Sequence, residues 1–523
     1  MGPTASELPL SIRDVDTVKA VVATCGAALL AGRALAPHWE GIPAAWRRGW
    51  DIALACLGLL AAFCWSNLGQ FNFPGFGHPS ETFHYYLGAK YFPELGYTRL
   101  YECVALADSR VAGGAARSAG RRLRNLETNV VESADAVLEA PDRCTQHFSA
   151  ERWRAFQADL SWFRDRPNPR RWRVLQLDHG YNATPVWGLF GGALAAGAPA
   201  SDRKILTLRL IDPVLLLLAF GCVWRSFGWR TLCVALLFFG THYPAQYGWI
   251  GGSYLRQLEL AALLVGICAL RSGWGVVAGA LVSLAALVRI HPAFLVLGPA
   301  FQVLGASLRE RRLLILPLQR RLLAGGLLGA AVLLVAAATL NGGFAAWQEF
   351  TNNSRVLLDT PLRNHMGLAT VLAWDPEQTA DKLADRSLED PYLPWKRARR
   401  ATFEARRPLF VALVAAALAL FAWAVQRQPL WVAVVLGAGL IPVATELTCY
   451  YSALLVVYAL LWERAPWVGA GLVGLAAAGW ASVELFHFFD PIFTWLSLVT
   501  VVYALTVYAV LGVAATRYDD PAA

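Results

Sequence analysis

Apolar runs long enough to be membrane-spanning helices recur along the chain. About 20 consecutive apolar residues are needed to cross the hydrocarbon core of a bilayer. Hydrophobic residues make up 56% of the 523 residues and charged residues only 16%, whereas an average soluble domain has about 25% charged residues. A soluble protein of this composition could not cover its surface with polar groups. The sequence therefore predicts an all-α polytopic membrane protein and excludes a soluble enzyme, a secreted disulfide scaffold and a β-barrel.

The runs predict about twelve transmembrane helices and two large polar regions, 70–204 and 342–408. A shorter apolar stretch, 20–32, does not reach the length of a span, so we expect the segment 1–49 to be cytoplasmic or interfacial. The first span is then 50–69, and both chain ends lie in the cytoplasm. The later spans lie within 205–341 and 409–514, before the tail 515–523, at about 205–224, 231–249, 254–270, 275–288, 292–307, 322–340, 409–425, 430–446, 447–463, 466–485 and 492–514.

The short loops on one side of these spans are basic, which is the pattern of cytoplasmic loops. Such loops and contact with anionic membrane lipid explain the net charge of +9, and no nucleic-acid-binding module is visible. Both polar regions then face the extracytoplasmic side, and their amphipathic stretches, 152–163 and 376–388, predict helices on the membrane surface. The basic cluster 396–407 disagrees with this orientation and leaves open a further crossing between 342 and 408.

The most informative polar segment opens the first polar region. A helix here places Glu81 and Tyr85 one turn apart on one face, and Tyr86 and Lys90 one turn apart as well. A carboxylate walled by aromatic rings at the membrane surface is poorly solvated, so we expect it to accept a proton readily, as a general base does. The alternative is a solvated glutamate in a first helical turn, with Ser80 as N-cap, beside aromatic residues of the interfacial belt.

This segment resembles the start of the first external loop in glycosyltransferases of the GT-C superfamily. The shared pattern is an acidic residue, a tyrosine and an aromatic residue one turn later, and then a glycine and a Leu-Tyr pair, which here are Glu81, Tyr85, Tyr86, Gly96 and Tyr101. It is most similar to the polyprenyl-phosphate-mannose-dependent mannosyltransferases. They carry a catalytic acidic residue, more often aspartate, at the position of Glu81.

Three later stretches are similar to motifs of the same family and follow in the same order. The stretch 181–185, Tyr-Asn-Ala-Thr-Pro, resembles its Tyr/Pro segment, and 287–292, Leu-Val-Arg-Ile-His-Pro, resembles a basic segment that ends in proline. The stretch 446–451, Glu-Leu-Thr-Cys-Tyr-Tyr, resembles a late polar-aromatic motif. The first polar region is longer than is usual in the family, and its middle has no counterpart there.

The resemblance implies transfer of a mannose-like sugar from a polyprenyl-phosphate donor to a hydroxyl of a glycan, glycolipid or protein acceptor. Catalysis would occur on the extracytoplasmic face of a multi-pass protein of the bacterial inner (plasma) membrane, with Glu81 as general base and Asp178 as the second candidate. Fixed cations must stabilise the leaving phosphate, and the planar fork of arginine suits this role. The candidates for binding this phosphate are Arg289, His291, Arg256, Arg363 and His365, and those for other substrate contacts are Tyr85, Tyr86, Tyr181, His242 and Tyr450.

Structural roles remain open for several of these residues. Arg289 could extend to the interface and pair with a loop carboxylate, and Arg256 could anchor the end of a span. His242 could be a buried structural histidine. Glu81 and Asp178 could also share a divalent cation, although no metal-ligand spacing supports one and the sequence implies no other cofactor.

Cysteine usage gives a further expectation. Of nine cysteines, only Cys103 and Cys144 lie in the long first polar region. They either form a disulfide, as an oxidising compartment allows, or remain two free thiols.

Two other functions compete with the glycosyltransferase interpretation. A secondary transporter or flippase of a lipid-linked or small polar substrate would also need polar residues and broken helices within the membrane. Such transporters usually have two similar halves, and none are visible here. A non-catalytic assembly protein that binds a lipid-linked glycan is the third possibility.

Overall fold

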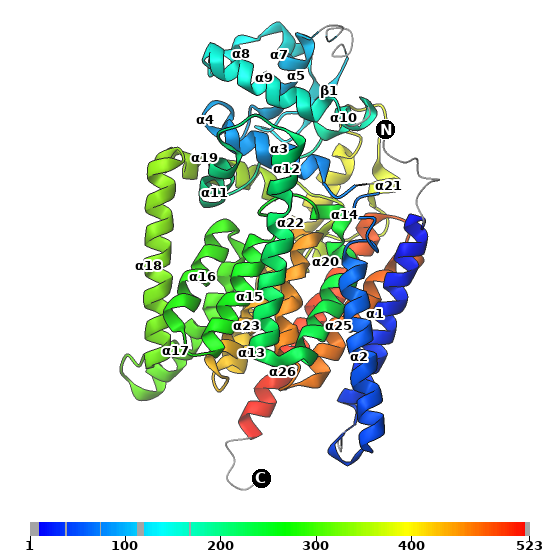
Figure 1. Ribbon diagram of the computed structural model, residues 1–523, viewed down its shortest axis with the longest axis vertical. Coiled ribbons are helices and arrows are strands. Elements are labelled where there is room, and N and C mark those ends of the chain that lie inside the picture. The colour runs from blue at the N-terminus through cyan, green and yellow to red at the C-terminus, as the bar shows by residue number, and fades with distance from the viewer. Residues whose placement is uncertain are drawn as a thin grey trace.

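The computed structural model shows a bundle of helices with a domain at one end that is formed by the first polar region, 70–204, and that we call the polar domain (Figure 1). It is 74% helical, and the strands of the described residues form two short two-stranded sheets, which confirms the all-α fold class. The first nine residues and the end of the predicted tail lie outside the described part of the chain. The structure describes residues 10–36, 39–73, 75–111, 114, 120–166 and 169–517.

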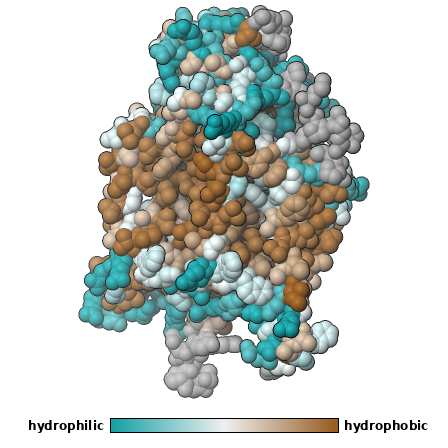
Figure 2. All heavy atoms as spheres, viewed as in Figure 1, coloured by the Kyte–Doolittle hydropathy of each residue, from teal (hydrophilic) through white to brown (hydrophobic). Residues whose placement is uncertain are grey.

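Eight helical segments among these residues are long and apolar enough to cross a membrane. On the face shown in Figure 2, hydrophobic side chains form a broad band over the bundle. The chain is thus membrane-embedded, while the number of crossings stays a prediction. The segments are α1 (Ile12–Ala34), α2 (Ala44–Trp65), α12 (Asp202–Arg209) with α13 (Ile211–Thr241), η4 (His291–Val296) with α17 (Leu297–Glu310), α18 (Pro317–Leu340), α22 (Leu393–Val425), α25 (Pro466–Leu485) and α26 (Phe489–Arg517).

Several predicted spans are shorter or broken helices. The span predicted for 254–270 becomes helical only at Leu258, and the one predicted for 430–446 is divided by a 3-10 turn. The stretch 447–463 contains a 3-10 helix of 13 residues. These shorter elements are η3 (Tyr243–Ala245), α14 (Tyr247–Ile250), α15 (Leu258–Arg271), α16 (Gly275–Val288), α23 (Leu430–Leu436), η5 (Gly437–Gly439), α24 (Leu440–Ala444) and η6 (Cys449–Leu461).

Helix α13 consists of two antiparallel halves that meet at Gly228, whose backbone is not helical (φ 84°, ψ 167°). Just after this residue, Arg230 binds Asp51 near the start of α2, with 2.7 Å between Nε and Oδ1. Further along, Gly240 lies against the backbone of Ala61, near the end of α2. The second half of α13 therefore runs alongside α2, and the first half folds back on it, with the ring centroids of Phe220 and Phe239 5.4 Å apart. That the two halves are separate spans stays a prediction.

The N-terminal helix differs from the prediction. Helix α1 has 23 residues, so the stretch 20–32 belongs to a helix that is long enough to span. It is antiparallel to α2, because Lys19 binds Asn67 beyond the end of α2, whereas Trp50 near its start donates to the Leu29 carbonyl at 3.1 Å. Helix α1 is therefore longer than the short interfacial helix that we expected, and the side of the membrane on which each chain end lies stays a prediction. Helix α1 begins beside the polar domain, and α26 ends at the opposite face (Figure 1).

The first polar region folds around its own hydrophobic core. Phe83, Tyr86, Tyr91 and Tyr101 are fully buried there. The amphipathic stretch 152–163 forms α9, as predicted. The elements of this region, preceded by η2 (Trp39–Gly41), are α3 (Pro79–Lys90), α4 (Phe92–Leu95), α5 (Leu100–Ser109), β1 (Arg122–Arg124), β2 (Val131–Ser133), α7 (Asp135–Glu139), α8 (Asp142–Thr145), α9 (Ala150–Arg164), α10 (Pro169–Leu175) and α11 (Pro185–Ala195).

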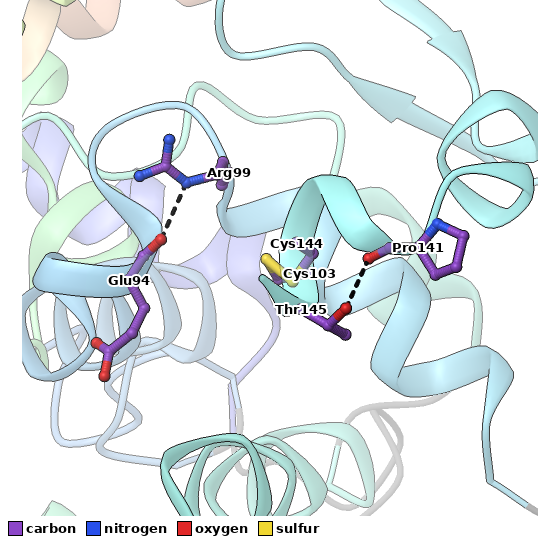
Figure 3. Close-up of a disulfide and its surroundings, with 6 residues drawn as sticks. All are labelled: Glu94, Arg99, Cys103, Pro141, Cys144 and Thr145. Carbon is purple, nitrogen blue, oxygen red and sulfur yellow. Dashed lines mark hydrogen bonds between the residues drawn. A yellow bond between two sulfur atoms is a disulfide. The ribbon is translucent and has the colours of Figure 1, made fainter. Parts of the chain in front are cut away.

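A disulfide joins Cys103 of α5 to Cys144 of α8 (Figure 3). Their Cα atoms are 5.4 Å apart, and both side chains are buried. The disulfide therefore links the start of the polar domain to its middle. The family resemblance offers no counterpart for this middle part.

The second polar region packs around the N-terminal half of α22 (Leu393–Val425). Its predicted helix 376–388 is reduced to the four residues of α21. No helix between α19 and α22 exceeds five residues, so none of them has the length of a further span. The basic cluster 396–407 lies within α22, where Arg406 donates to the Leu372 and Trp374 carbonyls at 3.0 and 2.9 Å. The elements are α19 (Gly343–Leu358), β3 (His365–Met366), α20 (Leu368–Leu372), α21 (Ala380–Leu383) and, later in the chain, β4 (Leu447–Thr448), which pairs with β3.

Basic residues gather at the end of the bundle away from the polar domain. The guanidinium carbon of Arg271 lies 4.1 Å from the Phe227 ring centroid, beside the α13 turn. Arg309, at the end of α17, donates to the Gln426 side chain after α22 at 3.3 Å. The predicted basic loops thus share one face, and the assignment of that face to the cytoplasm remains a prediction.

Candidate functional site

Glu81 lies in the first turn of α3, whose start is set by the residues just before it. Pro79 occupies the first turn, where its missing N–H is not needed. The N-cap is His78 and not Ser80, because His78 Nδ1 accepts the backbone N–H of Glu81 at 3.1 Å. The His78 N–H donates to the Gly252 carbonyl at 3.0 Å. The start of α3 is therefore tied to the segment between α14 and α15.

That segment is unwound and carries Arg256. Gly252 has a φ of +76°, and a Cβ atom there would lie 1.9 Å from the Phe76 carbonyl oxygen, so the close approach requires glycine. The Asp212 carboxylate accepts the backbone N–H groups of Arg256 and Gln257 at 3.0 and 3.1 Å. These bonds satisfy backbone groups that a helix would otherwise pair, and they fix the position of Arg256.

Two buried arginines converge on the phenol of Tyr85. Arg256 Nη1 and Arg289 Nη2 donate to its oxygen at 3.0 and 2.9 Å, and the phenol donates to Asn182 at 2.7 Å. Burial raises the pKa of Tyr85, so the phenol stays neutral and does not offset the charge of either arginine. Arg289 is only 6% exposed, and no carboxylate in the described residues lies close enough to form an ion pair with it.

Glu81 contacts one of these arginines, Arg256. Its Oε2 lies 3.3 Å from Arg256 Nε, but within the described residues it accepts no hydrogen bond of good geometry. The ring centroids of Tyr450 and Tyr451 lie 4.7 and 5.5 Å from the guanidinium carbon of Arg256. Elements far apart in sequence thus bring together Glu81, Tyr85, Arg256, Arg289 and Tyr450, which we call the arginine site.

His291 borders the arginine site and faces a carboxylate that the sequence analysis did not select. Its Nε2 lies 3.6 Å from Oε2 of Glu259, and its ring packs edge-on against Tyr451 at 4.5 Å. The chain is broken here between α16 and α17, as the following proline predicts. A cavity adjoins this pair and the arginine site. It is lined by Ile250, Arg256, Gln257, Glu259, Leu260, Tyr450, Tyr451, Ala453 and Leu454.

Other predicted site residues lie outside the arginine site. The Asp178 side chain is 49% exposed and contacts His84 at 3.8 Å, so it does not reach the arginines. Tyr86 binds Lys90, as its helical spacing predicts, within the core of the polar domain. The ring of Tyr181 packs edge-on against the ring of Tyr85, with ring centroids 5.8 Å apart.

His242 is a packed histidine. Its ring lies 4.3 Å from the Phe238 ring, and its Nε2 is 2.7 Å from the Ser452 hydroxyl. These contacts are those of a buried structural histidine, which was the alternative role for His242. The His242 side chain contacts neither Arg256 nor Arg289.

Arg363 and His365 lie outside the arginine site, and His365 belongs to a second polar cluster. His365 Nδ1 lies 3.9 Å from Glu446, which forms an ion pair with Arg399 and accepts a hydrogen bond from Thr370 at 2.8 Å. The Arg363 guanidinium lies over the Tyr392 ring, 4.3 Å from its centroid. We call Glu446, Arg399, Thr370 and His365 the clamp cluster, because they join α22, α20, β3 and the segment before β4.

Sequence reasoning missed three residues that hold the arginine site. Asp212 and Glu259 are acidic residues inside apolar runs, a signal that marks functional positions in membrane proteins and could have identified both. Tyr254 donates to the Tyr85 carbonyl at 3.0 Å, and no pattern in the sequence distinguishes it from an interfacial aromatic residue.

Within the described ranges, no three His, Cys, Asp or Glu side chains gather where they could share a metal ion. The structure therefore adds no support for a divalent cation between Glu81 and Asp178. No model of a known protein family matches the chain, and the searches of curated proteins and of solved structures also found no match.

Proposed function

We propose that this protein is a membrane glycosyltransferase that uses a polyprenyl-phosphate sugar as donor. The observation that carries the proposal is Arg289, a buried cation without an ion-pair partner in the described residues, which shares the Tyr85 phenol with Arg256 beside Glu81. A buried charge is costly unless it is paired. An anion that completes the pairing is therefore expected to bind here.

The arrangement supports each part of the transfer reaction. The acceptor hydroxyl oxygen forms a bond to the anomeric carbon of the sugar while the bond from that carbon to the phosphate oxygen breaks. Glu81 takes the hydroxyl proton, and the lipid phosphate leaves with the bonding electrons. Arg256 and Arg289 would bind the phosphate and stabilise its growing negative charge.

Binding of the donor phosphate to Arg256 would also free the Glu81 carboxylate from this arginine. Glu81 Oε2 lies 3.3 Å from Arg256 Nε, so this arginine engages the carboxylate. A phosphate that takes over Arg256 weakens this pairing at the moment when the acceptor proton must be accepted. The two arginines thus couple donor binding to activation of Glu81.

A second, small cavity lies within the bundle, and the donor lipid would have to widen it on entry. It shares Tyr451 and Leu454 with the cavity beside the arginine site. Its lining is largely apolar, as a polyprenyl chain requires. The lining residues are Met366, Ala438, Ile441, Pro442, Thr445, Leu447, Thr448, Tyr451, Ser452, Leu454, Leu455 and Thr500.

The test is transfer of radiolabelled sugar from polyprenyl-phosphate-mannose to a membrane glycolipid extract by the full chain in lipid nanodiscs. Glu81→Gln keeps the shape of the side chain and removes the base, so we expect turnover to fall by about 100- to 10,000-fold while donor binding persists. The matched control is Glu127→Gln, an exposed glutamate of the polar domain. Full turnover by the Glu81→Gln protein would contradict the proposed mechanism, and transport that survives this substitution would favour a transporter.

A further inference from the structure

A pair of buried polar atoms beside the arginine site lacks hydrogen-bond partners. These are Glu259 Oε2 and His291 Nε2, and neither has a partner among the described residues. The two side chains are 9% and 8% exposed, and the atoms are 3.6 Å apart, which is too long for a good hydrogen bond. Leaving such atoms unsatisfied in the interior is costly, so a missing partner is expected.

The spacing of the pair fits one small polar group. Because hydroxyl hydrogen bonds are about 2.8 Å long, a single hydroxyl oxygen can reach both atoms across the 3.6 Å gap. It would donate to the Glu259 carboxylate and accept from the N–H of His291. A neutral hydroxyl fits the pair better than a phosphate oxygen, because an ionised Glu259 would repel an anion.

The pair also lies at the right place for the sugar of a bound donor. Glu259 lines the cavity to which Arg256 contributes, and His291 packs against Tyr451, another residue of this cavity. A phosphate held by Arg256 would therefore place the sugar bonded to it against these side chains. Arg289 and His291 are separated by a single residue, so one broken segment between α16 and α17 serves both groups.

We propose that Glu259 and His291 bind one hydroxyl of the transferred sugar and so determine which sugar the enzyme accepts. This inference rests on the proposed glycosyltransferase function. A site built to bond a hydroxyl discriminates strongly against a sugar that lacks it, because its own polar groups are then left unpaired. The pair would thus add sugar specificity to an arginine site that recognises only the phosphate.

The experiment uses the full chain in nanodiscs with polyprenyl-phosphate donors that carry mannose, glucose or arabinose. The best donor is then compared with its monodeoxy analogues. We expect removal of one particular hydroxyl to lower kcat/KM by about 10- to 100-fold in the wild type, and by less than about threefold in Glu259→Gln and His291→Asn proteins. Binding of sugar-free polyprenyl phosphate should be equal in all three proteins, which also shows that the variants fold.

The outcomes separate this inference from the proposed function. A wild-type protein that transfers sugar but tolerates every deoxy donor shows that only a water occupies the gap, and the inference is then wrong. The same holds if the penalty persists unchanged in both variants. A wild type that transfers none of the parent donors refutes the proposed function, and this inference with it.

Discussion

The arginine site and the clamp cluster are two groups of buried charge at the boundary between the bundle and the polar domain, and they differ in how completely their members are paired. In the clamp cluster, Glu446 forms an ion pair with Arg399 and accepts a further hydrogen bond. In the arginine site, Arg289 has no carboxylate partner in the described residues, and Glu81 Oε2 accepts no hydrogen bond.

This difference separates a structural role from a binding role. The Glu446–Arg399 ion pair fixes the elements that carry it, here α22 and the segment before β4, and within the clamp cluster only His365 Nδ1 lacks a hydrogen-bond partner among the described residues. An unsaturated group of buried charges raises the energy of the empty protein, and a ligand that completes the pairing lowers it. Both groups contain Arg and Glu, so residue type alone does not distinguish them.

The largest expected effect is on turnover. Glu446→Gln, assayed in the same way as Glu81→Gln, should keep at least about a third of wild-type turnover per folded molecule, because Glu446 touches no reacting atom. Loss of the general base should lower turnover by about 100- to 10,000-fold. Equal losses in the two variants would show that the comparison between the two groups is wrong.

For stability, we expect the larger loss in Glu446→Gln and the smaller loss in Glu81→Gln. Removing one partner of a buried ion pair destabilises a protein by about 3–5 kcal/mol, and Glu446 is a quarter exposed, so we expect about 3 kcal/mol for Glu446→Gln. Glu81→Gln should cost less, because Glu81 Oε2 accepts no hydrogen bond from Arg256 in the described residues, whereas Glu446 accepts hydrogen bonds from Arg399 and Thr370. Unfolding of the purified proteins in mixed micelles with increasing SDS measures both, and a more stable Glu446→Gln protein would contradict the structural role.

The clamp cluster should also weaken in acid. Burial lowers the pKa of His365 to about 4, an effect that Glu446 opposes. The unfolded chain binds a proton at this residue below about pH 6.5, whereas the folded chain does so only near pH 4. Stability is therefore lost as the pH falls through this window, by about 2 kcal/mol between about pH 7.5 and pH 5.

The measurement for this prediction is the same micellar unfolding experiment at a series of pH values. A His365→Gln protein is the control, and its stability should fall less steeply over this range. Parallel curves for the two proteins would show that the histidine is not responsible for the acid sensitivity.

The smallest effect is expected from exchanging arginine for lysine. Arg289→Lys keeps the charge but loses the planar fork, so binding of polyprenyl phosphate should weaken by about tenfold. Arg399→Lys should leave this binding unchanged, since its guanidinium is engaged by Glu446. Titration of both proteins with polyprenyl phosphate in nanodiscs checks the prediction, and equal affinities would place the phosphate elsewhere.

Local patterns predicted much of the fold because the bilayer limits the choices. The runs on either side of Gly228 form antiparallel halves of α13, and the stretch 152–163 forms α9. The length of the N-terminal helix was underestimated because only its apolar stretch, 20–32, was counted. Helix α1 is longer than its apolar stretch, since Ser11 caps it and the polar end of Lys19 is satisfied by Asn67, far along the chain.

For the candidate site, the sequence by itself determined which residue types lie near the membrane boundary, namely Glu81, Arg256, Arg289 and Arg363, because each follows or interrupts an apolar run. Only the tertiary structure decided their partners. Tyr85 joins arginines that follow it by 171 and 204 positions, whereas Arg363 lies over the ring of Tyr392. Apolar periodicity depends on neighbouring residues, but pairing of charges depends on how distant helices pack, and no local pattern records that packing.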